Sequence, residues 1–332
     1  MINSMLFCLD DREYLANNII SFVNDYTPTS SQENVIELGY LRNQKFSDGE
    51  LCVDFIDSVR GKRIYILSSP NTSDEIMKLN LAIDAAKRGA AKEIIAVIPY
   101  FPYTRQDKKD QSRGPIGAKV VAEMIEQRGG TSVITYDLHA DQIQGFFNIP
   151  VTHIEGKNVF DDYIHLLLND SANDIILCGP DAGSGKRVKR MKDQIYNRYG
   201  INLNYIMLDK TRKEANVVDE MVIIGDVTNK DVIILDDIVD TAGTLCKAAE
   251  VLINSGAKSV RAIISHGVLS GPAYNRIDNS MLTELIISDS LETMVHEKII
   301  VVSVAKQIGI AIAASNKGLS YEGLKTSKKI IS

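Results

Sequence analysis

The sequence repeats one local pattern three times: a helical run, a glycine, and then a short apolar strand. The copies are residues 79–98 with Gly89, residues 116–136 with Gly129 and Gly130, and residues 245–265 with Gly256. A glycine just past a helix end can adopt the left-handed conformation without a steric clash at Cβ. The strands are near-continuous apolar runs, which is typical of parallel sheets covered by helices on both faces. The pattern therefore predicts an α/β fold with mostly parallel sheets.

Further apolar runs predict too many strands for one small sheet. These runs are residues 174–178, 205–208, 221–225, 232–235 and 299–304. A chain of 332 residues is long enough for about two domains. Because related units lie near residues 79–136 and 231–265, we predict two similar domains, each a mostly parallel sheet flanked by helices. The boundary is expected at the loop near residues 150–157, giving domains 1–152 and 153–332, with a C-terminal tail that packs back on the N-terminal domain.

Composition excludes several classes of protein. Hydrophobic residues make up 45% of the chain, which is enough for a sizeable core. Lys and Arg number 37 against 43 Asp and Glu, a net charge of −6, so a nucleic-acid partner is not expected. The four cysteines lie far apart, which argues against a disulfide scaffold or a zinc ribbon. We expect no signal peptide and no membrane partner, because every apolar stretch is far shorter than the roughly 20 residues of a membrane span, and we therefore expect a cytoplasmic protein.

Residues 232–244 join an apolar strand to two acids, a loop of small residues and a helix start. Small residues let backbone N–H groups converge on an anion, and the helix N-terminus adds partial positive charge. Adjacent Asp236 and Asp237 suit vicinal hydroxyls or a Mg²⁺-bound ligand. The presence of Asp240 in this loop needs a separate explanation, since its carboxylate would repel a phosphate. An ordinary helix N-cap explains one acid and one threonine. The whole pattern favours a ribose-phosphate site made of Asp236, Asp237, Asp240, Thr241, Ala242, Gly243 and Thr244.

This segment resembles the phosphoribosyl-diphosphate binding loop of type I phosphoribosyltransferase folds. Other motifs, in order along the chain, are similar to those of ribose-phosphate pyrophosphokinases. They are residues 46–50, 103–110, 137–147, 180–183, 210–213 and 266–272. The resemblance implies transfer of the β,γ-diphosphoryl group of ATP to O1 of ribose 5-phosphate, giving AMP and 5-phosphoribosyl 1-diphosphate for nucleotide biosynthesis. Such a transfer requires positioning and electrostatic stabilisation, with Mg²⁺ as the cofactor that bridges phosphate oxygens.

The resemblance also assigns roles to residues. It places His139 and Asp181 at Mg²⁺, Lys210 at the transition state and Arg212 at substrate phosphate. For ATP binding it implies Arg105 and Gln106, together with Phe46, Asp48, Gly49 and Glu50 from a neighbouring subunit. A homo-oligomer built from dimers, a hexamer for example, is therefore expected. Without the resemblance, these residues also fit simpler roles. His139 fits a core histidine, Phe46 fits a packed core residue, and Lys210 and Arg212 fit solvated surface residues.

The chain departs from the family pattern at three places. Lys45 replaces an arginine, and Ser184 replaces the second glycine after Asp181, where it is expected to restrict the backbone. Residues 319–323 differ from the usual tail, which is expected to loosen its docking and to weaken control by ADP and phosphate. Two other functions stay open: a base phosphoribosyltransferase, which uses the same loop, and a non-catalytic regulatory homologue.

Overall fold

The computed structural model describes residues 4–26, 35–171, 174–211 and 220–327. The chain divides into two compact units: Met1–Glu155 together with Ser303–Ser332, and Gly156–Val302. The expected division was 1–152 and 153–332. The last thirty or so residues group with the first unit because α8 (Ala305–Asn316) packs on α1 (Glu13–Asp25). No helix in the described ranges is long and apolar enough to cross a membrane.

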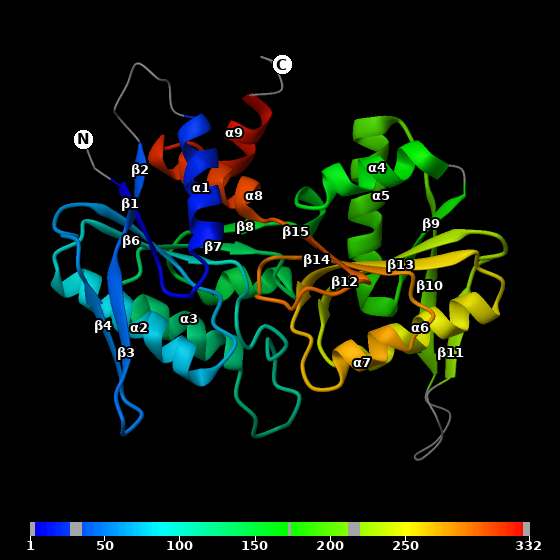
Figure 1. The fold of residues 1–332 in the computed structure, drawn as a ribbon, viewed down its shortest axis with the longest axis horizontal. Coiled ribbons are helices and arrows are strands. Elements are labelled where there is room, and N and C mark those ends of the chain that lie inside the picture. Colours follow the sequence, from blue (N-terminus) through cyan, green and yellow to red (C-terminus); the bar gives the residue numbers. More distant parts are fainter. Residues whose placement is uncertain (1–3, 27–34, 172–173, 212–219, 328–332) are drawn as a thin grey trace. The chain divides into compact units, whose positions relative to one another are not determined.

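The first unit is built on a six-stranded parallel sheet of order β2-β1-β5-β6-β7-β8. Helices α2 (Ser73–Arg88) and α3 (Gly117–Arg128) cover one face, and α1 and α8 cover the other (Figure 1). The four central strands, β1, β5, β6 and β7, are buried on both faces, as their apolar sequences predict. Their bounds are β1 Ser4–Cys8, β2 Ile36–Gly39, β5 Arg63–Leu67, β6 Glu93–Ile98, β7 Ser132–Tyr136 and β8 Val151–Ile154.

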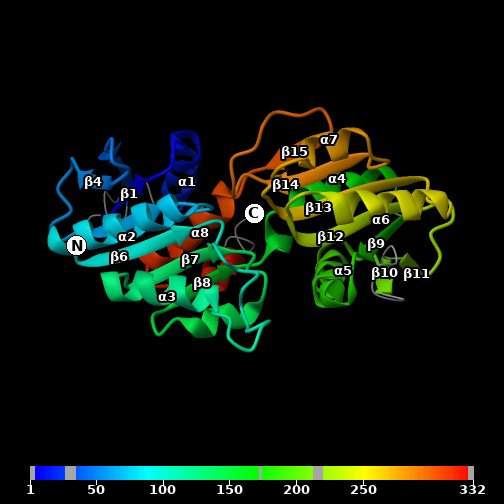
Figure 2. The ribbon, with the colours of Figure 1, turned by 90° about the horizontal axis from the view of Figure 1, so that it is seen from below.

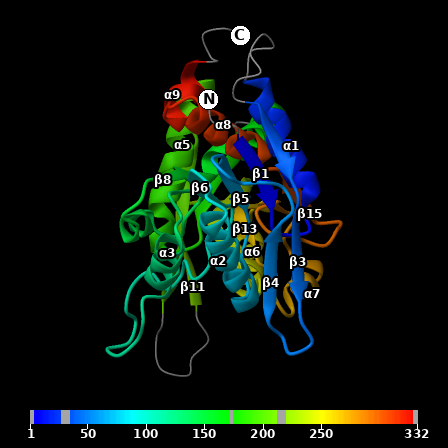
Figure 3. The ribbon, with the colours of Figure 1, turned by 90° about the vertical axis from the view of Figure 1, so that its left-hand side faces the viewer.

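An antiparallel hairpin, β3 (Leu41–Lys45) and β4 (Leu51–Phe55), extends from this unit (Figure 3). Its base is fixed by apolar packing, since the Phe55 ring meets the edge of Phe7 at a centroid distance of 4.7 Å and β4 lies on α2. The tip of the hairpin has no such packing and is exposed to solvent.

The second unit contains a seven-stranded sheet of order β11-β10-β9-β12-β13-β14-β15, parallel except for β11. Helices α4 (Asp161–Ser171) and α5 (Gly185–Tyr199) lie on one face, and α6 (Gly243–Asn254) and α7 (Ala273–Asp278) on the other (Figure 2). The strands are β9 Ile175–Gly179, β10 Asn204–Thr211, β11 Glu220–Ile224, β12 Asp231–Val239, β13 Ser259–Gly267, β14 Glu284–Ser288 and β15 Ile299–Val302. The predicted α/β fold with two similar, mostly parallel units is confirmed.

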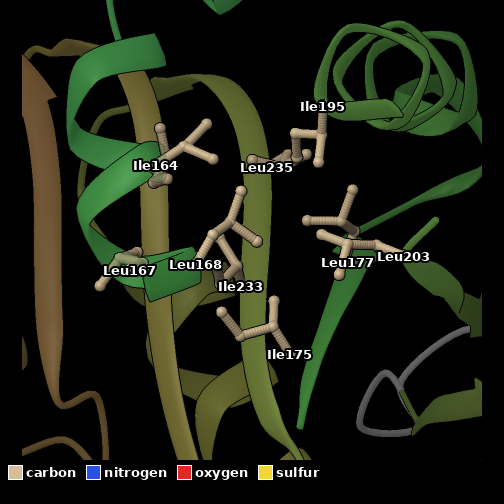
Figure 4. A pocket seen from close by; sticks show the side chains of 10 residues that line it. Ile164, Leu167, Leu168, Ile175, Leu177, Ile195, Leu203, Ile233 and Leu235 are labelled. Atoms are coloured by element: carbon tan, nitrogen blue, oxygen red, sulfur yellow. The ribbon is translucent and has the colours of Figure 1, made fainter. Parts of the chain in front are cut away.

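A seam under α4 and α5 is lined by ten Leu and Ile side chains (Figure 4). It has no room for a water molecule. Because it lacks both volume and polar groups, it is core packing between these helices and the sheet.

The glycine prediction is confirmed at Gly129 and Gly256, whose φ values are 121° and 95°. It is wrong at Gly89, which has a right-handed φ of −70°, while Ala90 takes the left-handed conformation. Gly89 is needed for space instead, because a Cβ there would lie 2.4 Å from Val59 Cγ2.

The C-terminal tail is docked, so the expected loosening is wrong. In α9 (Tyr321–Ser327) the buried Tyr321 hydroxyl donates to Gln307 Oε1 at 2.7 Å. Leu324, one helical turn further on, is also buried and supplies the apolar contact that the altered tail was expected to lack. Glu322 points to solvent and pairs with Lys325. Lys328 and Lys329 lie outside the described residues.

Candidate active site

In the second unit, the expected functional residues lie at the carboxyl ends of parallel strands or directly after them. These strand ends share one edge of the sheet. Asp181 comes after β9, Lys210 lies near the end of β10, and loop 240–244 follows β12. Because β9, β10 and β12 are parallel, their carboxyl ends meet at this edge, where ligands bind in open α/β sheets.

Asp236 and Asp237 lie within β12, which is longer than the predicted run 232–235. The strand continues because Asp236, Ile238 and Val239 pair in register with β13. The Asp237 N–H donates to Asp236 Oδ1 at 2.9 Å, and Arg187 Nη2 of α5 lies 3.8 Å from Asp237 Oδ1. Burial, and then the neighbouring Asp237 carboxylate, raise the pKa of Asp236 to about 7. An acidic pair of this kind, with Asp237 buried and Asp236 half-buried, is suited to hydroxyl donors or a cation.

Asparagine at position 236 should stabilise the metal-free protein more at pH 8 than at pH 5. The folded-state pKa of Asp236 lies above its ordinary value of 3.8, so the folded protein holds a proton that the unfolded chain releases. Stability therefore falls as pH rises from about 4 to about 7, and the neutral amide removes this loss. Thermal unfolding in a chelator at both pH values tests this. A variant that loses more stability at pH 8 than at pH 5 would contradict the assignment.

Loop 240–244 leads from β12 into α6. Ala242, the N-cap of α6, has a left-handed φ of 58°, which is unusual for a residue with a Cβ. Backbone conformations of this kind are found at functional sites. The N–H groups of Thr241, Ala242 and Gly243 donate to no acceptor in the described part of the chain. Three such amides beside a helix N-terminus are chemically suited to an anion.

Asp240 does not stand free at this loop. Its Oδ1 accepts a hydrogen bond from the hydroxyl of Ser270, in the loop after β13. This hydrogen bond gives Asp240 a structural role, because its carboxylate joins two neighbouring loops.

Asp181 is the N-cap of a short 3-10 helix, η3 (Ala182–Ser184). Its Oδ1 accepts from the Ser184 N–H at 2.9 Å, and the Ser184 hydroxyl donates to the Asp181 carbonyl oxygen at 2.6 Å. Ser184 has φ −75°, a conformation open to any residue, so the expectation that serine restricts the backbone here is wrong. Serine instead fixes the turn that presents Asp181 to solvent.

In the first unit, the structure brings Arg105, Gln106 and His139 onto adjoining loops. The His139 N–H donates to Thr104 Oγ1 at 3.1 Å, which joins the loops after β6 and β7. Two residues in these loops are left-handed without being glycine: Tyr103 with φ 55° and Asp137 with φ 40°. The Arg105, Gln106 and His139 residues are exposed, as a binding surface requires.

Residues 46–50 form the tip of the β3–β4 hairpin. The Phe46 N–H donates to the Glu50 carbonyl at 2.8 Å, the Glu50 N–H donates to Asp48 Oδ1 at 3.1 Å, and Gly49 supplies the required φ of 96°. All five residues are exposed, and Phe46 keeps 44% of its surface accessible. In Figures 1 and 3 the tip of the hairpin and the loop after β6 stand apart from each other.

Of the two residues expected to be catalytic, Lys210 and Arg212, the structure describes only the backbone of Lys210. Lys210 pairs with Met221 across β10 and β11, which fixes its backbone. Arg212 lies outside the described residues. Within the described ranges no group of three or more His, Cys, Asp or Glu residues could hold a metal ion. Mg²⁺ requires no such group, because it retains waters and binds substrate phosphates through one or two carboxylates.

Known proteins match this chain over most of its length. Residues 4–129 match the N-terminal domain of ribose phosphate pyrophosphokinase, and residues 201–321 match the phosphoribosyl synthetase-associated domain. The chain is 42% identical to the ribose-phosphate pyrophosphokinase of Oceanobacillus iheyensis over 312 residues, 92% of each chain. The chain belongs to the ribose-phosphate pyrophosphokinase family.

Two further relatives support this membership. The ribose-phosphate pyrophosphokinase of Helicobacter hepaticus is 48% identical over 273 residues, which covers 81% of this chain and 85% of the relative. The crystal structure of phosphoribosylpyrophosphate synthetase from Mycobacterium smegmatis matches with a TM-score of 0.84 at 31% identity, and covers 95% of this chain and 99% of that chain. The ribose-phosphate pyrophosphokinase fold, and an enzyme of this type, are therefore confirmed.

Three residues at this site were not among the sequence predictions: Arg187, Ser270 and Arg276. Ser270 lies inside a recognised motif, but its contact with Asp240 spans 30 residues. Arg276 donates to the Thr241 carbonyl across 35 residues. Such contacts depend on the pairing of β12 with β13 and leave no local signal in the sequence.

Proposed function

We propose that this chain transfers the β,γ-diphosphoryl group of ATP to O1 of ribose 5-phosphate, giving 5-phosphoribosyl 1-diphosphate and AMP for nucleotide biosynthesis. The observation that carries the proposal is the continuous arrangement of the acidic pair in β12, the left-handed Ala242 and the free amides at the start of α6. Family membership gives this arrangement its substrates. The proposed compartment is the cytoplasm, and no nucleic acid or membrane partner is proposed.

Ribose 5-phosphate is proposed to bind at loop 240–244. The 5-phosphate would accept hydrogen bonds from the free amides and from the hydroxyls of Thr241 and Thr244, both exposed. Asp236 and Asp237 would bind the ribose hydroxyls or a bound cation. Arg212 would bind substrate phosphate as a bidentate fork, and Lys210 would act as a point charge at the transition state.

The residues proposed to hold Mg²⁺ are Asp181 and His139. Asp181 fits because it is exposed and uses one carboxylate oxygen, Oδ1, in the turn, so Oδ2 remains for a cation. His139 would take part through a water, since Mg²⁺ prefers oxygen. When bound, the ion neutralises charge on the phosphate oxygens of ATP. The protein's own part is to orient the two substrates and to surround the transferred group with fixed positive charge.

ATP is proposed to bind between Arg105 and Gln106 of one subunit and residues 46–50 of another. The exposure of the Phe46 ring at a hairpin tip supports this, because a large exposed aromatic residue at a fixed turn is suited to stacking on a base. The enzyme would therefore be a homo-oligomer built from dimers.

Mixing two inactive variants should test the shared site. Phe46→Ala and Lys210→Ala damage different parts of one site, so subunit exchange should create some sites with both residues intact. We expect the mixture to regain activity well above either variant alone. Lys210→Ala mixed with Gly243→Val is the matched control, because both changes lie in the second unit and every site would stay damaged. Equal behaviour of the two mixtures would exclude a shared site.

The proposal itself is tested by incubation with ATP, ribose 5-phosphate and Mg²⁺. AMP should form only when all three are present. Release of ADP would indicate an ordinary kinase. A lack of any turnover would favour the regulatory homologue, and consumption of 5-phosphoribosyl diphosphate with a base would favour the transferase. Nothing in the comparisons favours these alternatives.

A further inference from the structure

Loop 240–244 is held from outside by a second segment, residues 267–276, which we call the supporting segment. It consists of the loop after β13 and the first part of α7, and α7 packs against α6 (Figure 1). The N–H groups of Val268 and Leu269 both donate to the Val239 carbonyl, at 2.9 and 3.2 Å. The two segments are therefore joined at the point where β12 enters loop 240–244.

The supporting segment has a fixed conformation of its own. Leu269 has a left-handed φ of 49°, yet its side chain is buried in the core formed by β12, β13 and β14. A strained backbone persists only where its surroundings determine it, and burial of the leucine side chain does so here. The segment is thus a firm base from which a side chain can orient a neighbouring loop.

Two side chains of the supporting segment contact loop 240–244. The Ser270 hydroxyl donates to Asp240 Oδ1, and Arg276 Nη1 donates to the Thr241 carbonyl oxygen at 2.9 Å. In a trans peptide the C=O and the following N–H point in opposite directions. Since the Thr241 carbonyl points to Arg276, the Ala242 N–H points away from it, and that N–H has no acceptor in the described part of the chain.

The Arg276 guanidinium also lies close to Gly243, where a Cβ would be 3.2 Å from Nη1. It therefore adds positive charge beside the amides of the loop. Ser270 occupies one oxygen of the only carboxylate within residues 240–244. Both contacts favour an anion at the loop. The Arg276 contact acts through charge and peptide orientation, and the Ser270 contact acts through the placement of the Asp240 carboxylate.

We propose that Arg276 and Ser270 are positioning residues that set the peptide orientation of loop 240–244 for the 5-phosphate of ribose 5-phosphate. This inference rests on the proposed function, because it takes loop 240–244 as the 5-phosphate site. Arg276 acts mainly through the Thr241 carbonyl, so its planar fork matters as well as its charge.

The test is the KM for ribose 5-phosphate at saturating Mg-ATP in four proteins: unaltered, Arg276→Ala, Arg276→Lys and Lys247→Ala. Arg276→Ala removes a charge-assisted hydrogen bond and should raise this KM roughly tenfold, with the KM for ATP unchanged. Arg276→Lys keeps the charge without the fork and should recover only part of the loss. Lys247→Ala removes a cation from the exposed side of α6, where it pairs with Glu250, and should change neither KM.

Ser270→Ala provides a second route if Arg276→Ala is unstable, and should raise the same KM by a smaller factor. A KM for ribose 5-phosphate within twofold of the unaltered protein in both variants would overturn the inference, as would equal increases in both KM values with a lower Tm. Failure of the proposed function is recognised separately, because the unaltered protein would then show no ribose 5-phosphate-dependent AMP.

Discussion

Alanine at position 210 should lower kcat by roughly 10²- to 10³-fold while the KM for ATP stays near its original value. Lys210 lies near the carboxyl end of β10, held there by pairing with Met221 of the antiparallel β11. Under the proposed function, a lysine at this edge of the sheet would supply charge to the group in transfer. Charge that contacts only the transition state acts on kcat more than on ground-state binding.

The measurement is a full rate series in both substrates for Lys210→Ala. Lys230→Ala is the matched control, because Lys230 precedes β12 at the opposite edge of the same sheet, where it pairs with Asp174 at 3.9 Å. That control should keep kcat within about twofold of the original, as surface ion pairs contribute little. Equal losses of ATP binding and turnover in Lys210→Ala would show that Lys210 binds ATP in its ground state.

Valine at position 243 should raise the KM for ribose 5-phosphate by roughly 30-fold and leave the KM for ATP unchanged. Gly243 is the first residue of α6, and its amide is one of those without an acceptor. A Cβ there would already lie 3.2 Å from Arg276 Nη1, so a branched side chain would both displace the arginine and keep a phosphate from the backbone.

Gly243→Ala is the graded control, since a single methyl needs only a small shift of the flexible Arg276 side chain. Its KM for ribose 5-phosphate should fall between those of glycine and valine. A rise in the KM for ATP alone would show that the two phosphate sites have been assigned the wrong way round.

The sequence predicts the sheets well because buried parallel strands are apolar runs with sharp ends. It does not predict the full length of β12. Asp236 and Asp237 interrupt the apolar run, and only register with β13 shows that the strand continues to Val239. The same limit applies to Gly89, whose need for space arises from Val59, a residue distant in sequence.

Sequence motifs locate the candidate residues within each unit but not the contacts between the loops that carry them. Loop 240–244 is recognisable by its own residues, whereas the hydrogen bond from Arg276 to Thr241 depends on tertiary packing. In the tail, the departure of residues 319–323 from the usual sequence predicts loose docking. The helical turn of α9 brings Leu324 to the core instead, an outcome that depends on how the segment folds.

The reaction proposed for this chain moves a diphosphoryl group intact from ATP to the sugar. The measurement uses ³¹P NMR to follow ATP that carries ¹⁸O on the non-bridging oxygens of its β- and γ-phosphates, with ribose 5-phosphate and Mg²⁺ present. We expect both labels to appear together as a diphosphate on C1 of the sugar, with unlabelled AMP in equal amount, as this reaction requires. Transfer of the γ-label alone, with labelled ADP left behind, would contradict it.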